Sequence, residues 1–175
     1  MSRLQDQQVA RRQLREMIHY AESSACRRQT LFAYFGEQSP TRCDACDNCV
    51  APRASYDATT ISQKFLSCVF RIRQSSQLST GMNHVIDVLT GASTEKVRRW
   101  NHHTLTTYGI GADVDRKEWA AMGRELLRQG YLRQSGNEFP VLEITPAGLS
   151  ALRSRKIIML APPPMARPKT KLPSR

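Results

Sequence analysis

The sequence of 175 residues carries 26 lysine and arginine side chains against 15 acidic ones, a formal net charge of +11. Such an excess of positive charge points to a polyanion as the partner. No run of apolar residues approaches bilayer-spanning length, which argues against a membrane protein. The opening MSRLQDQQ contains no apolar signal region, so we expect a protein of the reducing cytoplasm.

The charge is distributed unevenly along the chain. Residues 1–50 carry 7 basic and 6 acidic side chains, whereas residues 51–175 carry 19 and 9. The length suffices for one full domain and a smaller module, and only the larger part can bury a sizeable core unaided. We therefore expect the polyanion to bind mainly to the second part.

Two helices are predicted in the first part of the chain. Apolar residues recur among charged ones over residues 5–22, the pattern of an amphipathic helix. Two serines at 23–24 interrupt this helix and provide an N-cap, and a second helix over 25–35 ends at Gly36. An apolar cluster closes the second helix, and we expect it to pack in a core, with stacking on nucleic-acid bases as the alternative: Leu31, Phe32, Tyr34 and Phe35.

Four cysteines in this part have a spacing, C-x16-C-x2-C-x2-C, that is typical of a metal site: Cys26, Cys43, Cys46 and Cys49. Four thiolates complete the coordination of Zn²⁺ and leave no position for a catalytic water, so we predict a structural zinc site. Disulfides and an iron–sulfur cluster are the alternatives. The reducing compartment disfavours the first, and the lack of a further nearby cysteine disfavours the second. Two helices and a loop form a small core, so we expect folding to depend on the metal.

After a linker at 51–56, helical patterns continue. A capping box at 60–63 predicts a helix whose apolar face includes Cys68, which we interpret as a core residue and not as a ligand. A second helix is predicted at 84–89. A third begins after residues 93–94 and interleaves basic and apolar residues, as a helix presented to phosphate would. A basic face that is merely solvated is the alternative for each of these residues.

Adjacent histidines follow the third helix. His102 and His103 would point apart on a helix and have no acidic partner at a useful spacing. We interpret both as polar surface residues or phosphate contacts, not as metal ligands.

In the last part of the chain, the spacing of apolar residues changes from the period of a helix to that of a strand. Asp115 opens a capping box and an amphipathic helix that ends at Gly130. Residues 131–135 and 141–145 alternate around a Gly-Asn turn, which predicts a hairpin. A helix at 146–155 precedes a proline-rich basic tail at 161–175, expected to be disordered.

These elements predict a mainly α protein with a zinc-binding helical subdomain at 1–54, a winged-helix DNA-binding domain at 55–160 and the tail. The hairpin forms the wing, and the helix at 115–129 takes the place of the recognition helix. The helix around 96–100 is expected to pack beside it.

Basic side chains on the winged helix are the candidate DNA contacts. Those on the two helices and the hairpin are Lys96, Arg98, Arg99, Arg116, Lys117, Arg124 and Arg133. The motif GxxxxGK[ST] is missing, so no ATP site is visible, and we expect the chain alone to be inactive as an ATPase.

The segments CRRQTLFAYFGE and CDACDNC, together with MNHVIDVLTGAS and TTYGIGAD, resemble the RecQ family of DNA helicases in the region after the motor. The resemblance implies a zinc-binding subdomain, with the four cysteines as ligands, followed by a winged helix (RQC) that binds duplex DNA. It further implies a 3′–5′ helicase of DNA repair and recombination. The motor lobes are missing from the sequence, so the chain is expected to be a fragment, a truncated product or an accessory protein.

Two hypotheses follow. The first is a zinc-stabilised DNA-binding region that docks duplex or partly single-stranded DNA beside a motor supplied in cis. The second is a free-standing winged-helix regulator with a metal- or redox-responsive cysteine site. A regulator of this kind normally dimerises, and neither end of the sequence offers a heptad seam, so we favour the first and expect a monomer.

Overall fold

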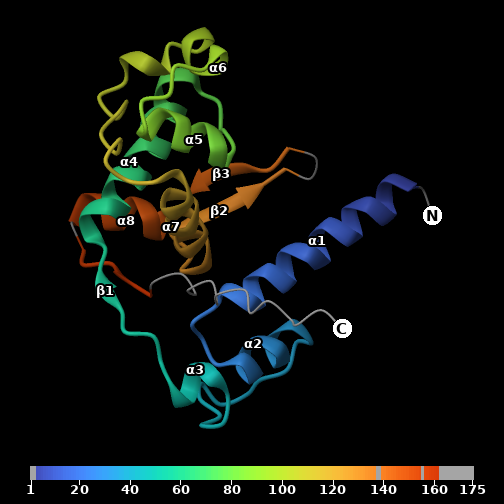
Figure 1. Cartoon of the computed structure of the whole chain (residues 1–175). Coiled ribbons are helices and arrows are strands. Elements are labelled where there is room, and N and C mark those ends of the chain that lie inside the picture. The colour runs from blue at the N-terminus through green and yellow to red at the C-terminus, as the bar shows by residue number, and fades with distance from the viewer. Residues whose placement is uncertain (1–2, 137–138, 155, 162–175) are drawn as a thin grey trace, which may run out of the picture.

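The computed structural model describes residues 3–136, 139–154 and 156–161, and Figure 1 shows their arrangement. The elements in chain order are α1 (Arg3–Glu22), α2 (Arg27–Tyr34), α3 (Asp47–Val50), β1 (Tyr56–Asp57), α4 (Thr59–Ser76), α5 (Met82–Leu89), α6 (Glu95–Arg99), the 3₁₀ turn η1 (His102–Thr104), α7 (Arg116–Arg128), β2 (Leu132–Ser135), β3 (Val141–Ile144), α8 (Pro146–Ser154) and β4 (Met159–Leu160). The fold is mainly helical, as predicted. No helix among the described residues is long and apolar enough to cross a membrane.

The buried apolar core lies entirely between Ala58 and Leu160. Helix α4 contributes one face of it and packs against α5, α7, α8 and β3. The indole of Trp119 on α7 is fully buried and donates from Nε1 to the Gly111 carbonyl at 2.9 Å. Cys68 is also fully buried in this core, as predicted. We call this part of the molecule, residues 58–160, the wing domain.

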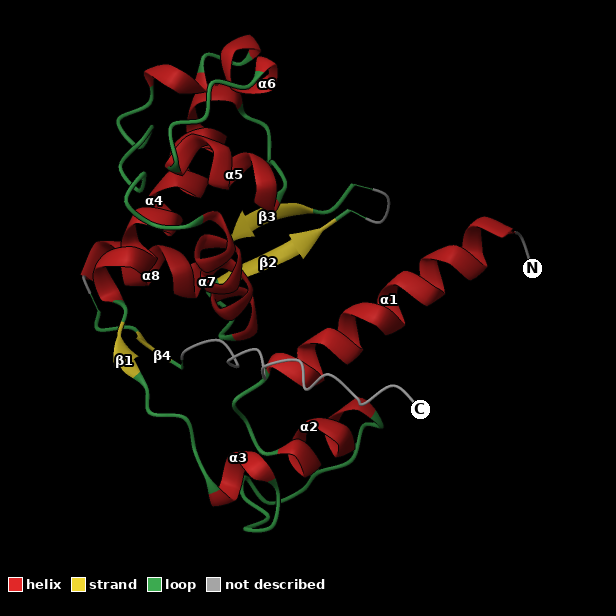
Figure 2. Ribbon diagram, in the orientation of Figure 1, coloured by secondary structure: helices red, strands yellow, loops and turns green. Residues whose placement is uncertain are grey.

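The two predicted strands form an antiparallel hairpin in which Leu132 pairs with Ile144 and Ser135 pairs with Val141 (Figure 2). Gly136 follows β2 with a φ of +85°, a conformation that glycine adopts without strain. The Leu142 amide also donates to the Thr80 carbonyl at 2.8 Å, which fastens the hairpin to the segment between α4 and α5. The wing prediction is confirmed up to the turn, whose residues 137–138 lie outside the described part.

A second strand pair was not predicted. β1 and β4 pair antiparallel, with Tyr56 opposite Leu160, and the Ala58 amide donates to the Ile158 carbonyl at 2.9 Å. The linker therefore ends in a strand, and the chain after α8 returns to it. Two-residue strands carry too little periodicity to be found by pattern. The remaining tail, residues 162–175, lies outside the described residues.

The first part of the chain has the two predicted helices, but their apolar side chains are not packed. Val9, Leu14 and Met17 on α1 are 54%, 60% and 63% exposed. The cluster at the end of α2 is exposed too, from 40% for Phe32 to 68% for Phe35, so the expectation that it packs in a core was wrong. We call residues 3–57 the zinc module.

Three helix starts compare differently with the predictions. The Asp115 carboxylate accepts from the Lys117 amide at 2.7 Å, so the predicted cap of α7 is confirmed. Helix α6 begins after Thr94, as predicted, and the Thr94 hydroxyl accepts from the Val97 amide at 3.3 Å. The capping box at 60–63 was wrong. Helix α4 already begins at Thr59, whose amide is bound by the Asp57 carboxylate at 2.9 Å.

Candidate metal centre and nucleic-acid interface

The four cysteines of the zinc module meet at one point. Their Sγ atoms all lie within 4.8 Å of one another, and those of Cys43 and Cys49 are 4.0 Å apart. Cys26 comes from the N-terminus of α2, and the other three come from the loop that leads into α3. A tetrahedral Zn²⁺ with Zn–S bonds of about 2.3 Å separates its sulfurs by about 3.8 Å. The thiols therefore fit a zinc ion.

Backbone amides surround the sulfurs. The amides of Arg27, Cys43 and Cys46 donate to Cys46, Cys49 and Cys43 Sγ at 3.5, 3.4 and 3.3 Å. The Arg27 amide lowers the pKa of Cys46 to about 6. The Cys43 amide acts likewise on Cys49, but burial and the neighbouring thiols outweigh it and raise the pKa of Cys49 to about 11. Four thiolates thus require a cation between them.

Two polar side chains fix the position of this loop. The Arg27 guanidinium donates to both carboxylate oxygens of Asp47 at 3.0 Å and to the carbonyls of Tyr20 and Ala21 at the end of α1. The Asn48 amide donates to the Ser23 and Ala25 carbonyls at 2.9 and 2.8 Å. These bonds join α1, α2 and α3 around the thiols. Arg27 and Asn48 were not singled out from the sequence. Arg27 directly follows Cys26, and Asn48 directly precedes Cys49.

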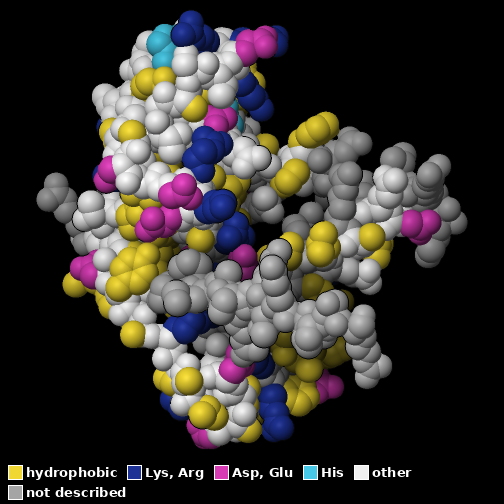
Figure 3. All heavy atoms as spheres, in the orientation of Figure 1, with side chains coloured by type: hydrophobic (Ala, Val, Ile, Leu, Met, Phe, Trp, Pro, Cys, Tyr) yellow, Lys and Arg dark blue, Asp and Glu magenta, His cyan; other side chains and the backbone are white. Residues whose placement is uncertain are grey.

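At the other end of the molecule, α6 presents exposed cations: Lys96, Arg98 and Arg99. Among the described residues, no carboxylate lies within 4.0 Å of them. Figure 3 shows Lys and Arg side chains gathered at this end of the wing domain. These three cations are available to phosphate.

Helix α6 rests on a buried aromatic cluster. His84 Nε2 lies 2.7 Å from His102 Nδ1, and the Trp100 ring makes edge contacts with both imidazoles at 5.1 and 5.7 Å. The Lys96 ammonium lies 4.9 Å from the centre of the Trp100 ring. Burial, followed by His102 and Lys96, lowers the pKa of His84 to about 4, so the pair is neutral at pH 7.

His102 was therefore misinterpreted from sequence. It is fully buried, whereas His103 is exposed as expected. An adjacent pair gives no signal of this difference, because the partner His84 lies on another helix.

The other candidate DNA contacts have partners within the molecule. Arg116 pairs with Asp87 at 2.7 Å, Arg124 with Glu22 at 2.6 Å, and Arg133 with Glu143 at 2.6 Å. Lys117 is exposed and has no carboxylate within 4.0 Å in the described part. The expectation that α6 packs beside α7 was wrong in position, since α6 contacts α5 and η1, and α5 lies between it and α7 (Figure 1).

Comparison with known proteins agrees with this geometry. The model of the RQC domain family matches residues 52–169, and the RecQ zinc-binding family matches residues 1–50. The chain belongs to the RecQ family. It is 34% identical over 157 residues to the ATP-dependent DNA helicase RecQ of Haemophilus influenzae, covering 89% of this chain and 25% of that protein.

Two further RecQ relatives are similar to the chain. That of Pasteurella multocida is 34% identical over 89% of this chain and 24% of its own length. That of Bacillus subtilis is 31% identical over 81% of this chain and 23% of its own length. The chain thus spans about a quarter of the curated RecQ proteins it matches.

The family membership decides between the metal alternatives. The RecQ zinc-binding match and the four clustered thiols together show structural Zn²⁺ as the cofactor of this region. In this RecQ region the zinc module is followed by a winged-helix RQC domain, as the sequence predicted. The limits 1–54, 55–160 and 161–175 stay a prediction.

Proposed function

We propose that the chain is the zinc-stabilised DNA-binding region of a RecQ-type 3′–5′ helicase acting in DNA repair and recombination. Its role is to dock duplex DNA beside the motor of the full protein. The observation that carries this proposal is the set of α6 cations that have no carboxylate partner among the described residues. The buried His84–His102 pair lies beneath them. We place the protein in the cytoplasm, at the nucleoid in a bacterium, and expect a monomer.

The zinc site is proposed to be purely structural, with Cys26, Cys43, Cys46 and Cys49 as its ligands. Four thiolates saturate the ion, which holds together helices that share little apolar contact. The amides that point at the sulfurs stabilise the thiolates and fix their orientation. The metal supplies folding free energy and takes no part in chemistry.

DNA contact is proposed to begin with phosphates at α6 and to extend to Lys117. The paired residues Arg116, Arg124 and Arg133 contribute less, because each must give up a carboxylate before it binds phosphate. Phosphate contacts carry no base information, so binding should follow DNA shape, such as a duplex with a single-stranded end, more than sequence.

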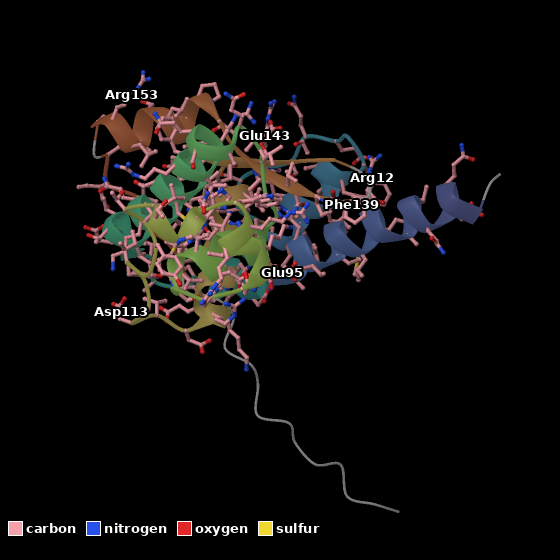
Figure 4. All side chains as sticks on the ribbon, turned by 90° about the horizontal axis from the view of Figure 1, so that it is seen from above. Arg12, Glu95, Asp113, Phe139, Glu143 and Arg153 are labelled. Atoms are coloured by element: carbon pink, nitrogen blue, oxygen red, sulfur yellow. The ribbon has the colours of Figure 1, made fainter. Side chains whose placement is uncertain are left out.

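The hairpin offers an apolar contact to such an end. Phe139 is 81% exposed and lies where the hairpin projects from the wing domain, on the side of α1 (Figures 1 and 4). An exposed ring of this kind can stack on an unpaired base, worth about 1–3 kcal/mol. Phe139→Ala should therefore reduce the preference for a junction over a plain duplex, whereas Phe139→Trp should retain it.

The motor is proposed to dock on the exposed apolar side chains of the zinc module. Leu14 and Met17 of α1, Phe32 of α2 and Phe35 just after it are between 40% and 68% exposed. Apolar side chains in such number are normally covered by a partner. The chain spans about a quarter of the RecQ helicases it matches, and the remaining length of a full protein would supply this partner.

The deciding experiment measures duplex affinity against salt for Lys96, Arg98 and Arg99 changed together to Ala. If each neutralises one phosphate, the slope of log affinity against log salt should flatten by roughly 2.7, at about 0.9 per contact. The matched control changes three other exposed cations, Arg71, Arg153 and Lys156, of which Arg153 lies on a different side of the domain from Glu95 of α6 (Figure 4).

The control variant should keep the original slope. The competing account assigns DNA binding to the basic tail. An unchanged slope in the α6 variant, together with loss of duplex binding on deletion of residues 161–175, would contradict the proposal.

A further inference from the structure

A groove of about 1240 Å³ lies between α1 and α7. Its apolar lining includes Ile18 of α1, Met122 of α7 and Tyr56 of β1. Ala161, the last described residue of the chain, also lines it. The tail, residues 162–175, therefore starts next to a residue that lines the groove.

The charged side chains that line the groove are five acidic ones and four lysines or arginines. Glu22 is paired with Arg124 at 2.6 Å, and Glu125 with Arg128, with an Nε to Oε2 distance of 2.7 Å. Glu16 and Glu118 also line the groove and have no basic side chain within 4.0 Å in the described part of the chain. Burial raises the pKa of Tyr56, and Glu118 and Glu125 add to this shift in the same direction.

The tail has the complementary character. Residues 162–175 contain four basic side chains and no acidic one, and they add two large apolar side chains, Met165 and Leu172. Three consecutive prolines at 162–164 restrict the backbone, which lowers the entropy lost when such a segment is held in place.

The tail is also long enough. Helix α7 has 13 residues, so it is about 20 Å long at 1.5 Å per residue. A polyproline-like segment of the 14 residues 162–175 extends about 43 Å at 3.1 Å per residue. Fourteen residues are therefore long enough to span the side of α7 that lines the groove.

We propose that residues 162–175 dock in the groove between α1 and α7, with Lys169 and Lys171 against Glu16 and Glu118. The docked tail covers the side of α7, the predicted recognition helix, that lines the groove and includes Lys117 and Arg124. It thus occupies the surface on which a duplex or another protein would otherwise lie.

Zero-length carbodiimide cross-linking of the full chain without DNA tests this docking, because the reagent joins a lysine amine only to a carboxylate in contact. Two surface ion pairs at about 0.7 kcal/mol each should favour the groove by roughly tenfold. Cross-links from Lys169 and Lys171 to Glu16 and Glu118 should therefore exceed those to Glu37 and Glu95 by that factor. The last two are exposed acids outside the groove and serve as matched controls.

Changing Glu16 and Glu118 together to Gln should remove the groove cross-links without moving them to Asp115 or Glu125. Reversing charges, with Glu118→Lys combined with Lys169→Glu and Lys171→Glu, should restore a cross-link through the amine introduced at position 118. Unchanged tryptophan fluorescence would show that each variant is folded. Equal yields at groove and control acids would overturn the proposal. Since no DNA is present, failure of the proposed DNA-binding function would leave this result unaffected.

Discussion

The wing domain and the zinc module are stabilised in different ways. The wing domain buries a continuous apolar core that includes Phe65, Ile86 and Trp119 at 0–1% exposure. In the zinc module, the buried residues within the described part are Ser23, Cys26 and Cys49, two of which are thiols of the cluster. One region is held by removal of apolar surface from water, and the other by a metal ion and hydrogen bonds to backbone carbonyls.

This difference has a consequence for function. A region with a core keeps its surface geometry without help, which suits the cations on α6. A region held at one point leaves long helix faces open, which suits docking of a partner. The two regions meet at the ion pair of Arg124 with Glu22.

Metal removal should separate the two regions most clearly. Cys46→Ser leaves three thiolates and should cost much of a zinc-binding free energy on the order of 10 kcal/mol or more. We expect loss of one Zn²⁺ per chain and of helical circular dichroism. Fluorescence should change little, because both tryptophans, Trp100 and Trp119, lie in the wing domain.

Cys68→Ala is the matched control, since it removes a buried thiol outside the cluster and should leave the zinc content unchanged. Iron in the purified protein, or intact module helices without any metal, would contradict the account of the zinc module.

Truncation of apolar side chains should have opposite outcomes in the two regions. Leu126 is fully buried, so Leu126→Ala should lower the free energy of unfolding of the wing domain by about 2–5 kcal/mol. Leu14 is 60% exposed, so Leu14→Ala should change it by less than about 0.5 kcal/mol. Denaturant titration followed by tryptophan fluorescence measures both. Comparable losses would mean that α1 is packed in solution.

Acidification should weaken the wing domain through His84. Its pKa is lowered from 6.5 to about 4 by burial, so between these values the unfolded chain binds a proton that the folded chain does not. Stability is therefore full above pH 6.5 and falls as the pH drops toward 4, by about 3 kcal/mol from this group at 1.36 kcal/mol per unit.

The slope of the unfolding free energy against pH over this range measures the effect. His84→Gln should flatten the slope, although it lowers the stability at pH 7. His103→Gln, at the exposed neighbour of His102, should leave the slope as it is. A slope that is equally steep in all three proteins would exclude His84 as its source.

A smaller loss than that from His84 is expected at the start of α7. Asp115→Ala removes the side chain that binds the Lys117 amide and should cost about 1 kcal/mol. Asp115→Asn keeps an acceptor and should lower the free energy of unfolding by only about 0.3 kcal/mol. Equal losses in thermal unfolding for the two variants would show that the charge of Asp115, and not the cap, is what matters.

The sequence by itself determined the helices of the wing domain, the hairpin and the set of clustered cysteines. Each of these is encoded within a short window, as an apolar period, a turn residue such as Gly136 or a ligand spacing. The positions of Gly36 and Gly130 at helix ends were predictable for the same reason, since both adopt a positive φ.

The tertiary structure alone decided which side chains are covered and which charges are paired. Arg124 and Glu22 are 102 residues apart in the chain, and His102 is buried because His84 on another helix faces it. The apolar residues of α1 have a helical period, but no described element lies over them, so they are exposed. A period records that a face is apolar, whereas its burial depends on a partner surface that local sequence does not specify.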